Sequence, residues 1–166
     1  VNHDGISKRD IGVVNGRIVE IGDLTSASSG ELIDCTGLHI LPGIIDSQVH
    51  FREPGKEYKE DLESGSRSAV LGGVTAVFEM PNTNPLTISE EALNDKVKRG
   101  YHRMHCDYAF WVGATRDNIY ELAELERLSG VAGIKVFMGS STGNLLVDDD
   151  KSVRLILQNT RRRTAF

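Results

Sequence analysis

The sequence predicts an α/β fold built around a parallel sheet. From Gly43 onward, apolar runs of strand length alternate with longer stretches that have helical spacing, as in successive βα units. The strand-length runs are mostly apolar, which is typical of strands covered on both faces. Residues 1–42 differ because they contain no long helical pattern. We therefore expect part of a small β domain over residues 1–42 and βα units over residues 43–166.

Within the leading segment, a hairpin is the clearest prediction. The runs Ile11–Val14 and Arg17–Ile21 flank the pair Asn15 and Gly16, which is typical of a tight primed turn. A further short strand is expected at residues 32–34, joining the same small sheet.

The second segment is predicted to hold four βα units. Gly72 and Gly73 end the first helix, a capping box of Thr87 and Glu90 begins the second, and Asp117 caps the third. The expected strands are 44–50, 74–80, 106–113 and 133–138, and the expected helices are 59–71, 87–103, 117–128 and 148–159. This order fits either a doubly wound sheet or a barrel.

Composition excludes several classes of protein. The chain has 166 residues, a net charge of −5 and 39% hydrophobic residues, an ordinary composition for a soluble domain. No apolar stretch is long enough to span a membrane, and no secretory signal is visible. Cys35 and Cys106 lack CxxC spacing, which favours reduced thiols and a cytoplasmic location. The acidic balance argues against nucleic acid as a partner.

A cluster of polar residues closes the first predicted strand of the second segment. Strict alternation places Asp46, Gln48 and His50 on one face of this strand. Buried polar groups need hydrogen bonds, a metal or a ligand as partners, although a half-exposed strand with a wet face is the plainer alternative. The rigid turn that follows carries Arg52 beside the end of the strand, and this favours a functional site.

The stretch LPGIIDSQVHFREPG resembles the signature of the cyclic amidohydrolases, and HFREPG is most similar to dihydroorotase. In that family, two His on this strand bind zinc, and Gln48 occupies the place of the first. A neutral amide oxygen suits zinc less well than an imidazole nitrogen does. The resemblance therefore implies His50 as a metal ligand, Gln48 as a doubtful one, and Asp46 as an acidic residue that supports a ligand.

Lys135 lies in the middle of the apolar run GIKVFM. A lysine on the inner face of a buried strand has a depressed pKa and a neutral amine unless it is paired, whereas a lysine at a strand end can extend its amine to solvent. The run resembles the fourth strand of the amidohydrolases, where carbon dioxide carboxylates the lysine and the carbamate bridges two metal ions. The resemblance therefore implies a carboxylated Lys135 as a metal ligand.

The run MPNTNP directly follows the second βα strand, and turn chemistry alone explains its composition. In dihydroorotases, the Asn of this motif and the Arg of HFREPG hold the substrate carboxylate. The resemblance therefore implies that Asn82 and Arg52 bind substrate, which suits a guanidinium fork and an amide donor. Hydantoinases and allantoinases share the metal site but need not hold a carboxylate.

The resemblance also decides between the two architectures in favour of a barrel. A complete (β/α)8 barrel takes roughly 250 residues, so the four βα units make about half of a TIM-like barrel. Half a barrel leaves strand edges uncovered, and we expect this chain to be part of a longer protein. In the family, the general-base Asp and further ligands come from later strands, beyond Phe166. No catalytic residue is therefore expected within the chain, and we expect it to be inactive alone.

The function implied for the full-length protein is a zinc-dependent dihydroorotase of pyrimidine biosynthesis with two zinc ions per chain, acting on a small molecule as a homo-oligomer. One alternative is a non-catalytic relative with a structural role in an assembly with aspartate transcarbamoylase, and the motivation for it is Gln48. The other is a hydantoinase or allantoinase. The remaining candidates have ordinary structural explanations: they are the run GSSTG over 139–143 and the residues His3, His39, His102 and His105.

Overall fold

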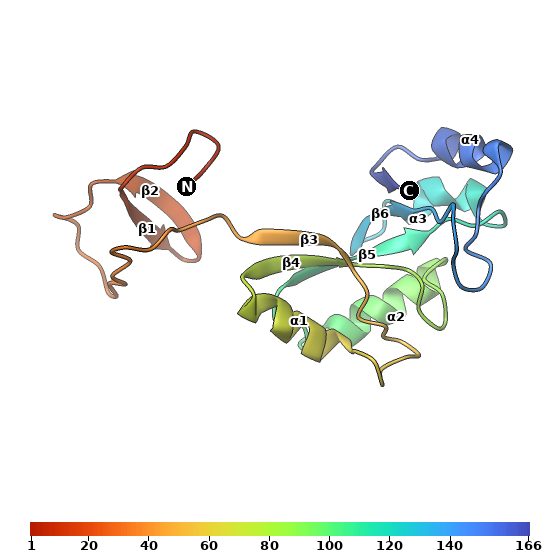
Figure 1. Cartoon of the computed structure of the whole chain (residues 1–166), viewed down its shortest axis with the longest axis horizontal. Coiled ribbons are helices and arrows are strands. Elements are labelled where there is room, and N and C mark those ends of the chain that lie inside the picture. Colours follow the sequence, from red (N-terminus) through yellow and green to blue (C-terminus); the bar gives the residue numbers. More distant parts are fainter. The chain divides into compact units, whose positions relative to one another are not determined.

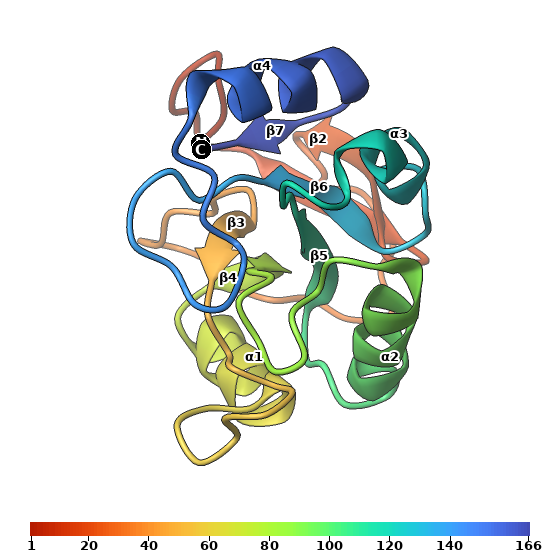
Figure 2. The same cartoon turned by 90° about the vertical axis from the view of Figure 1, so that its right-hand side faces the viewer.

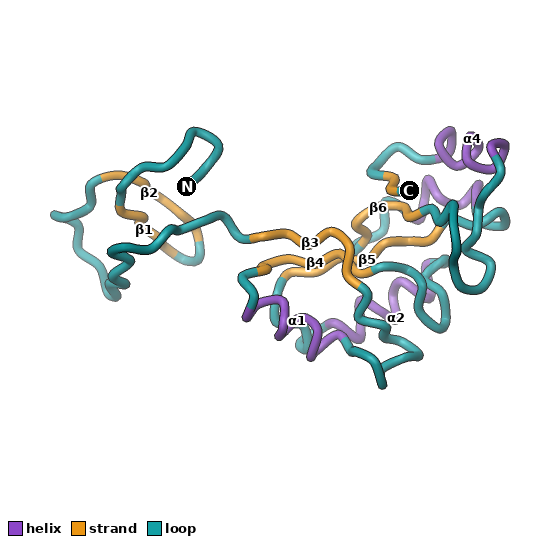
Figure 3. Tube along the Cα trace, in the orientation of Figure 1, coloured by secondary structure: helices purple, strands orange, loops and turns teal.

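A computed structural model describes all residues, 1–166, and divides them into two compact units, Val1–Pro42 and Gly43–Phe166 (Figure 1). Each unit has its own secondary structure, which is purely β in the first and mixed in the second (Figure 3). None of the helices has the length and apolar character that a membrane crossing would require.

The first unit contains the predicted hairpin. Strands β1 (Asp10–Val14) and β2 (Arg17–Gly22) pair antiparallel. Asn15 and Gly16 join them with φ values of 50° and 72°. Two successive positive φ angles define the primed turn that matches the twist of a hairpin, so this prediction is confirmed.

The prediction of a strand at residues 32–34 is wrong. Residues 32–34 belong to no strand, and the small sheet consists of β1 and β2 alone. Leu32 is 88% exposed and Ile33 is 74% exposed. A strand is stabilised by a hydrogen-bonded neighbour and a buried face, and this segment has neither within its unit.

The second unit is a curled parallel sheet with helices on its outer side (Figure 2). Its strands run in the order β3-β4-β5-β6-β7, and every neighbouring pair is parallel. This half-barrel confirms the predicted fold class and adds a short fifth strand. The strands are β3 (Ile44–Val49), β4 (Val74–Glu79), β5 (Asp107–Gly113), β6 (Val131–Lys135) and β7 (Thr164–Ala165). The helices are α1 (Leu62–Leu71), α2 (Glu90–Gly100), the 3-10 turn η1 (Ile119–Glu121), α3 (Leu122–Leu125) and α4 (Asp150–Asn159).

Helix starts differ from the predictions because other side chains supply the caps. Helix α1 begins after Asp61, whose side chain accepts from the Ser64 N–H, so it starts at Leu62 rather than at residue 59. Ser89, not Thr87, caps α2. Thr87 is fully buried and its hydroxyl lies 3.3 Å from that of Thr83, which leaves it unable to cap.

The third helix is much shorter than predicted and has no side-chain cap. Asn118 explains the difference. Its side-chain oxygen accepts from the Thr115 N–H, and its amide donates to the carbonyls of Ile88 and Gly113. These bonds stabilise a turn in place of the first helical turn expected after Asp117.

Two apolar clusters lie on opposite sides of the sheet. The larger one joins strand residues such as Val77 and Ile134 to helix residues such as Leu93 and Ile156. The smaller one contains strand and strand-end residues only, including Met80, Trp111 and Ala132. The smaller cluster therefore marks the concave inner face, and the larger one marks the face covered by helices.

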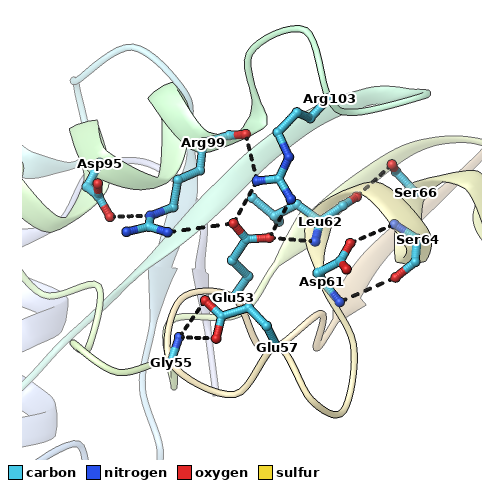
Figure 4. A network of polar contacts seen from close by, with 10 residues as sticks. All are labelled: Glu53, Gly55, Glu57, Asp61, Leu62, Ser64, Ser66, Asp95, Arg99 and Arg103. Atoms are coloured by element: carbon cyan, nitrogen blue, oxygen red, sulfur yellow. Dashed lines mark hydrogen bonds and ion pairs between the residues drawn. The ribbon is translucent and has the colours of Figure 1, made fainter.

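A buried carboxylate fixes the turn that follows β3 (Figure 4). Glu53 is 3% exposed and accepts from both terminal nitrogens of Arg103, at 2.7 and 3.1 Å, and from the Leu62 N–H at 3.0 Å. The Arg99 guanidinium lies 3.7 Å from the same carboxylate. These contacts attach the turn to the first residue of α1 and to the end of α2.

Burial by itself raises the pKa of Glu53. The hydrogen bonds from Arg103 and Leu62, together with the charges of Arg103 and Arg99, outweigh this effect, so the pKa lies below the ordinary value of 4.5. Glu53 therefore stabilises the fold above pH 4.5, and this contribution is lost as the pH falls through the lowered pKa.

We expect Glu53→Gln to lower the free energy of unfolding at pH 7 by about 1–3 kcal/mol, because an amide cannot replace the charge-assisted bonds to two arginines. Urea denaturation measures the change, and the difference from wild type shrinks below the Glu53 pKa. The matched control is Glu57→Gln, since Glu57 is exposed in the same turn and binds the Gly55 N–H. The control should stay within about 0.5 kcal/mol. Equal effects of both variants would contradict the role of Glu53.

Candidate metal and substrate site

Parallel pairing aligns the carboxyl ends of the strands at one edge of the sheet. The register pairs Val49 with Glu79, and Gly113 with Lys135. His50 directly follows β3 and Lys135 ends β6. The loop that carries Asn82 follows β4. Side chains from three separated segments are thus brought to the same edge, which is where barrels of this type place their functional groups.

His50 and Lys135 also lie on the same face of the sheet. Val49 and Phe51, on either side of His50, both pack against the helix-covered core, and so do Ile134 and Val136 on either side of Lys135. Alternation then turns His50 and Lys135 towards the concave face.

His50 is held by Asn82. The His50 Nδ1 lies 2.9 Å from the Asn82 Oδ1. An amide oxygen only accepts hydrogen bonds, so Nδ1 carries the proton and donates it, and Nε2 keeps its lone pair. This is the arrangement that orients a metal-binding histidine. The sequence prediction gave Asn82 a substrate role only, and the contact with His50 emerges from the structure.

The surroundings of His50 are rich in positive charge. Burial lowers the pKa of His50 below its ordinary value of 6.5, and the Asn82 hydrogen bond opposes this effect in part. The charges of Arg52, Lys135 and Lys96 lower the pKa further. His50 is therefore neutral at physiological pH, and the edge of the sheet favours a negatively charged ligand.

Lys135 is 8% exposed, and no carboxylate lies within ion-pair distance of its amine. Its nearest distinctive contact is the ring of Phe137, whose centroid is 5.3 Å from Nζ. Burial lowers the pKa of Lys135, which raises the share of neutral amine. A neutral amine is the form that reacts with carbon dioxide, so the environment suits carboxylation.

Arg52 has an unusual backbone and a free side chain. Its φ is +70°, a left-handed conformation that costs a residue other than glycine roughly 1 kcal/mol. Its N–H donates to the buried carboxylate of Glu79, and the next residue, Glu53, is held by Arg103. The Arg52 guanidinium makes no hydrogen bond or ion pair within the chain. The guanidinium is therefore positioned yet available to a ligand.

The structure does not show whether Asp46 and Gln48 share a face with His50, because the strand is irregular between Asp46 and Val49. The ladder between β3 and β4 shifts register between Asp46 and Val49, so a shared face with His50 is not imposed. Asp46 instead accepts a hydrogen bond of 3.0 Å from the Gln48 N–H, and both side chains are exposed. Asp46 makes no hydrogen bond with His50. The predicted roles of both residues stay predictions.

The other histidines lie elsewhere. His105 contacts Glu63 at 3.0 Å, near the start of β5 and therefore at the amino-terminal edge of the sheet. His3 lies 3.3 Å from Asp4 in the first unit. The run 139–143 forms part of the loop after β6, as expected for a connection.

Sequence analysis missed a buried ion pair beneath the site. Glu79 and Lys96 are each 1% exposed and contact one another through Oε2 and Nζ. A signal was available, since Glu79 interrupts the apolar run VTAVFEM and Lys96 shares a helix face with Leu93 and Gly100.

The donors fit a zinc site in kind but not in number. His50 offers a nitrogen and a carboxylated Lys135 would offer oxygen, and zinc accepts both. Zinc takes four donors, however, and the chain holds no group of three or more His, Cys, Asp or Glu placed to bind a metal. These residues alone do not complete a zinc site.

Comparisons with known proteins agree with this arrangement. The sequence model of the amidohydrolase family matches residues 39–144. An allantoinase of Deinococcus radiodurans is 34% identical over 142 residues, which cover 85% of this chain and 32% of the relative. A dihydroorotase of Ruminiclostridium cellulolyticum is 40% identical over 127 residues, covering 74% of this chain and 30% of the relative.

The fold is matched by the solved structure of an L-hydantoinase from Arthrobacter aurescens, with a TM-score of 0.86 and 30% identity. The match covers 93% of this chain and 35% of the hydantoinase. The chain thus spans about a third of the length of the relatives it matches. Because the family model covers well over half of its residues and the half-barrel agrees with a solved cyclic amidohydrolase, the chain belongs to the amidohydrolase family.

Proposed function

We propose that the protein is a hydrolase of cyclic amides whose substrate is dihydroorotate, opened reversibly to N-carbamoyl-L-aspartate. The chain carries one part of the site, so the activity is proposed for the protein as a whole. The observation that carries the choice of substrate is the Arg52 guanidinium, which lies near His50 and makes no hydrogen bond or ion pair within the chain.

Dihydroorotate carries a carboxylate beside its ring amide, and the site offers matching donors. Arg52 can form a bidentate pair with a carboxylate. Asn82 uses its oxygen to accept from His50, which leaves its Nδ2 group to donate to a ligand. One amide would thus orient the imidazole and bind the substrate at the same time.

The role of His50 follows from its tautomer, since Nδ1 donates to Asn82 and Nε2 keeps its lone pair on a residue of the concave face. His50 Nε2 and a carboxylated Lys135 would hold a zinc ion together with ligands supplied from outside these residues. When bound, zinc would supply Lewis-acid activation of water and of the amide carbonyl.

A second candidate is an allantoinase or hydantoinase activity. Relatives named allantoinase match this chain about as well as those named dihydroorotase, and the solved structure with a TM-score of 0.86 is a hydantoinase. Allantoin and hydantoin carry no carboxylate, so Arg52 would have no partner in such a substrate. Arg52 therefore discriminates between the two candidates.

The first test compares two ligands that differ by one group. We expect the 166-residue chain to bind dihydroorotate at least about tenfold more tightly than dihydrouracil, which has the same ring without the carboxylate. Arg52→Met should abolish this preference, whereas Arg67→Met, at an exposed position on α1, should preserve it. Titration calorimetry measures all six combinations of protein and ligand. A stronger response to allantoin or hydantoin would favour the second candidate.

The second test addresses Lys135 directly. We expect ¹³C-labelled bicarbonate to give a carbamate signal in the NMR spectrum of the chain, because Lys135 is buried and unpaired. Lys135→Met should remove the signal, and Lys151→Met, at an exposed lysine of α4, should leave it in place. A signal that survives Lys135→Met would show carboxylation elsewhere and remove Lys135 from the site.

The third test concerns Gln48. We expect Gln48→His to tighten zinc binding by at least about tenfold if position 48 is a ligand position, because an imidazole nitrogen then replaces an amide oxygen two residues before His50. Leu71→His adds an imidazole at another exposed position, at the opposite edge of the sheet, and should not tighten binding. Calorimetry of the chain with zinc gives both affinities. Unchanged affinity in Gln48→His would mean that position 48 does not limit metal binding.

A further inference from the structure

The Glu79–Lys96 pair occupies an apolar layer between the sheet and α2. Glu79 ends β4, and Lys96 lies on the face of α2 that packs against the sheet. The Lys96 amine is 5.0 Å from the centroid of the Phe110 ring. Burial raises the pKa of Glu79 to about 7 and lowers the pKa of Lys96. Burial therefore disfavours the charged form of both side chains.

Stability alone does not explain such a pair. Two apolar side chains of similar size commonly stabilise a core as well as a buried ion pair does, because desolvation offsets the attraction. The contacts that the pair makes with its surroundings therefore matter more than the attraction between its members.

Those contacts lead to two loops of the candidate site. Glu79 accepts from the N–H of Arg52, which stands in the loop after β3. Lys96 donates to the carbonyl of Met80 at 3.1 Å, and Met80 opens the loop after β4. Met80 also donates its own N–H to the Val49 carbonyl at 3.0 Å. The buried Glu79–Lys96 pair thus connects the loop after β3 to the loop after β4.

Each loop carries a group that must be held in place. In the first loop, Arg52 has the left-handed φ of +70°, which needs compensating contacts to persist. In the second, Asn82 follows Met80 by two residues and fixes the tautomer of His50.

We propose that Glu79 and Lys96 are positioning residues that lock the Arg52 loop and the Met80–Asn82 loop to each other, and so fix the geometry of Arg52, Asn82 and His50. The effect of this pair on ligand binding rests on the proposed function. The anchoring of the two loops does not rest on it, because contacts within the chain define the anchoring.

The test replaces the pair by apolar residues. In the double variant Glu79→Leu with Lys96→Met, we expect the urea midpoint to be unchanged or higher, because no uncompensated charge remains. We expect the Arg52 amide to exchange with solvent at least about tenfold faster than in wild type, because it loses its acceptor. In ¹⁵N NMR spectra, His50 should change from one tautomer to a mixture.

The matched control is Lys98→Met, which makes the same substitution at an exposed position of the same helix. It should leave the Arg52 exchange and the His50 spectrum unchanged, and amide exchange at Val77 and Phe110 should remain slow in both variants. Because no substrate is present, a failed ligand experiment does not affect this result.

Two outcomes would overturn the proposal. One is wild-type exchange at Arg52 and a wild-type His50 spectrum in a folded double variant, which would make the pair an ordinary core element. The other is the same change in Lys98→Met. Should the double variant fail to fold, Glu79→Met decides, since it removes the acceptor of the Arg52 N–H and keeps a side chain of similar length. Faster Arg52 exchange in that variant supports the proposal, and unchanged exchange contradicts it.

Discussion

The parallel alignment of β3, β4, β5 and β6 is the constraint on which the rest of the candidate site depends. Since every strand of the second unit runs in the same direction, all its strand ends of one kind gather at one edge. His50, Asn82 and Lys135 are separated by many residues in the chain and lie at the same edge only for this reason. A strand in the opposite direction would send its terminal residue to the other edge.

The edge is then made rigid by groups that never face a ligand. Glu53 attaches the turn after β3 to α1 through Leu62, to α2 through Arg99 and to the segment after α2 through Arg103 (Figure 4). Glu79 and Lys96 connect the loop after β3 to the loop after β4 from within the core. A residue with a left-handed backbone such as Arg52 persists only where its surroundings determine it from several sides. The contacts of Glu53 and Glu79 therefore hold the backbone of Arg52 in place, while its guanidinium stays free.

The electrostatic character of the site follows from the same arrangement. Arg52, Lys135 and Lys96 lower the pKa of His50, so the imidazole is neutral although the chain as a whole carries a charge of −5. Net charge is thus a poor guide to the ligand at this edge. The Arg52 guanidinium favours a carboxylate, whereas the overall composition merely disfavours nucleic acid.

The sequence by itself determined the features that depend on neighbours in the chain. The Asn15–Gly16 hairpin, the alternation of strands with helices and the placement of His50 at a strand end all rest on local periodicity or turn chemistry. The family resemblance at HFREPG supplied the barrel, and the half-barrel and the family match agree with it.

Only the tertiary structure decided which side chains meet. The bond between His50 and Asn82 spans 32 residues, the bonds between Glu53 and Arg103 span 50, and the contact between Glu79 and Lys96 spans 17. No periodicity links such positions. The same holds for the caps, because Thr87 is a good capping residue by type but is buried elsewhere. Long-range packing sets these contacts, since each polar group must find a partner that lies close in space rather than in sequence.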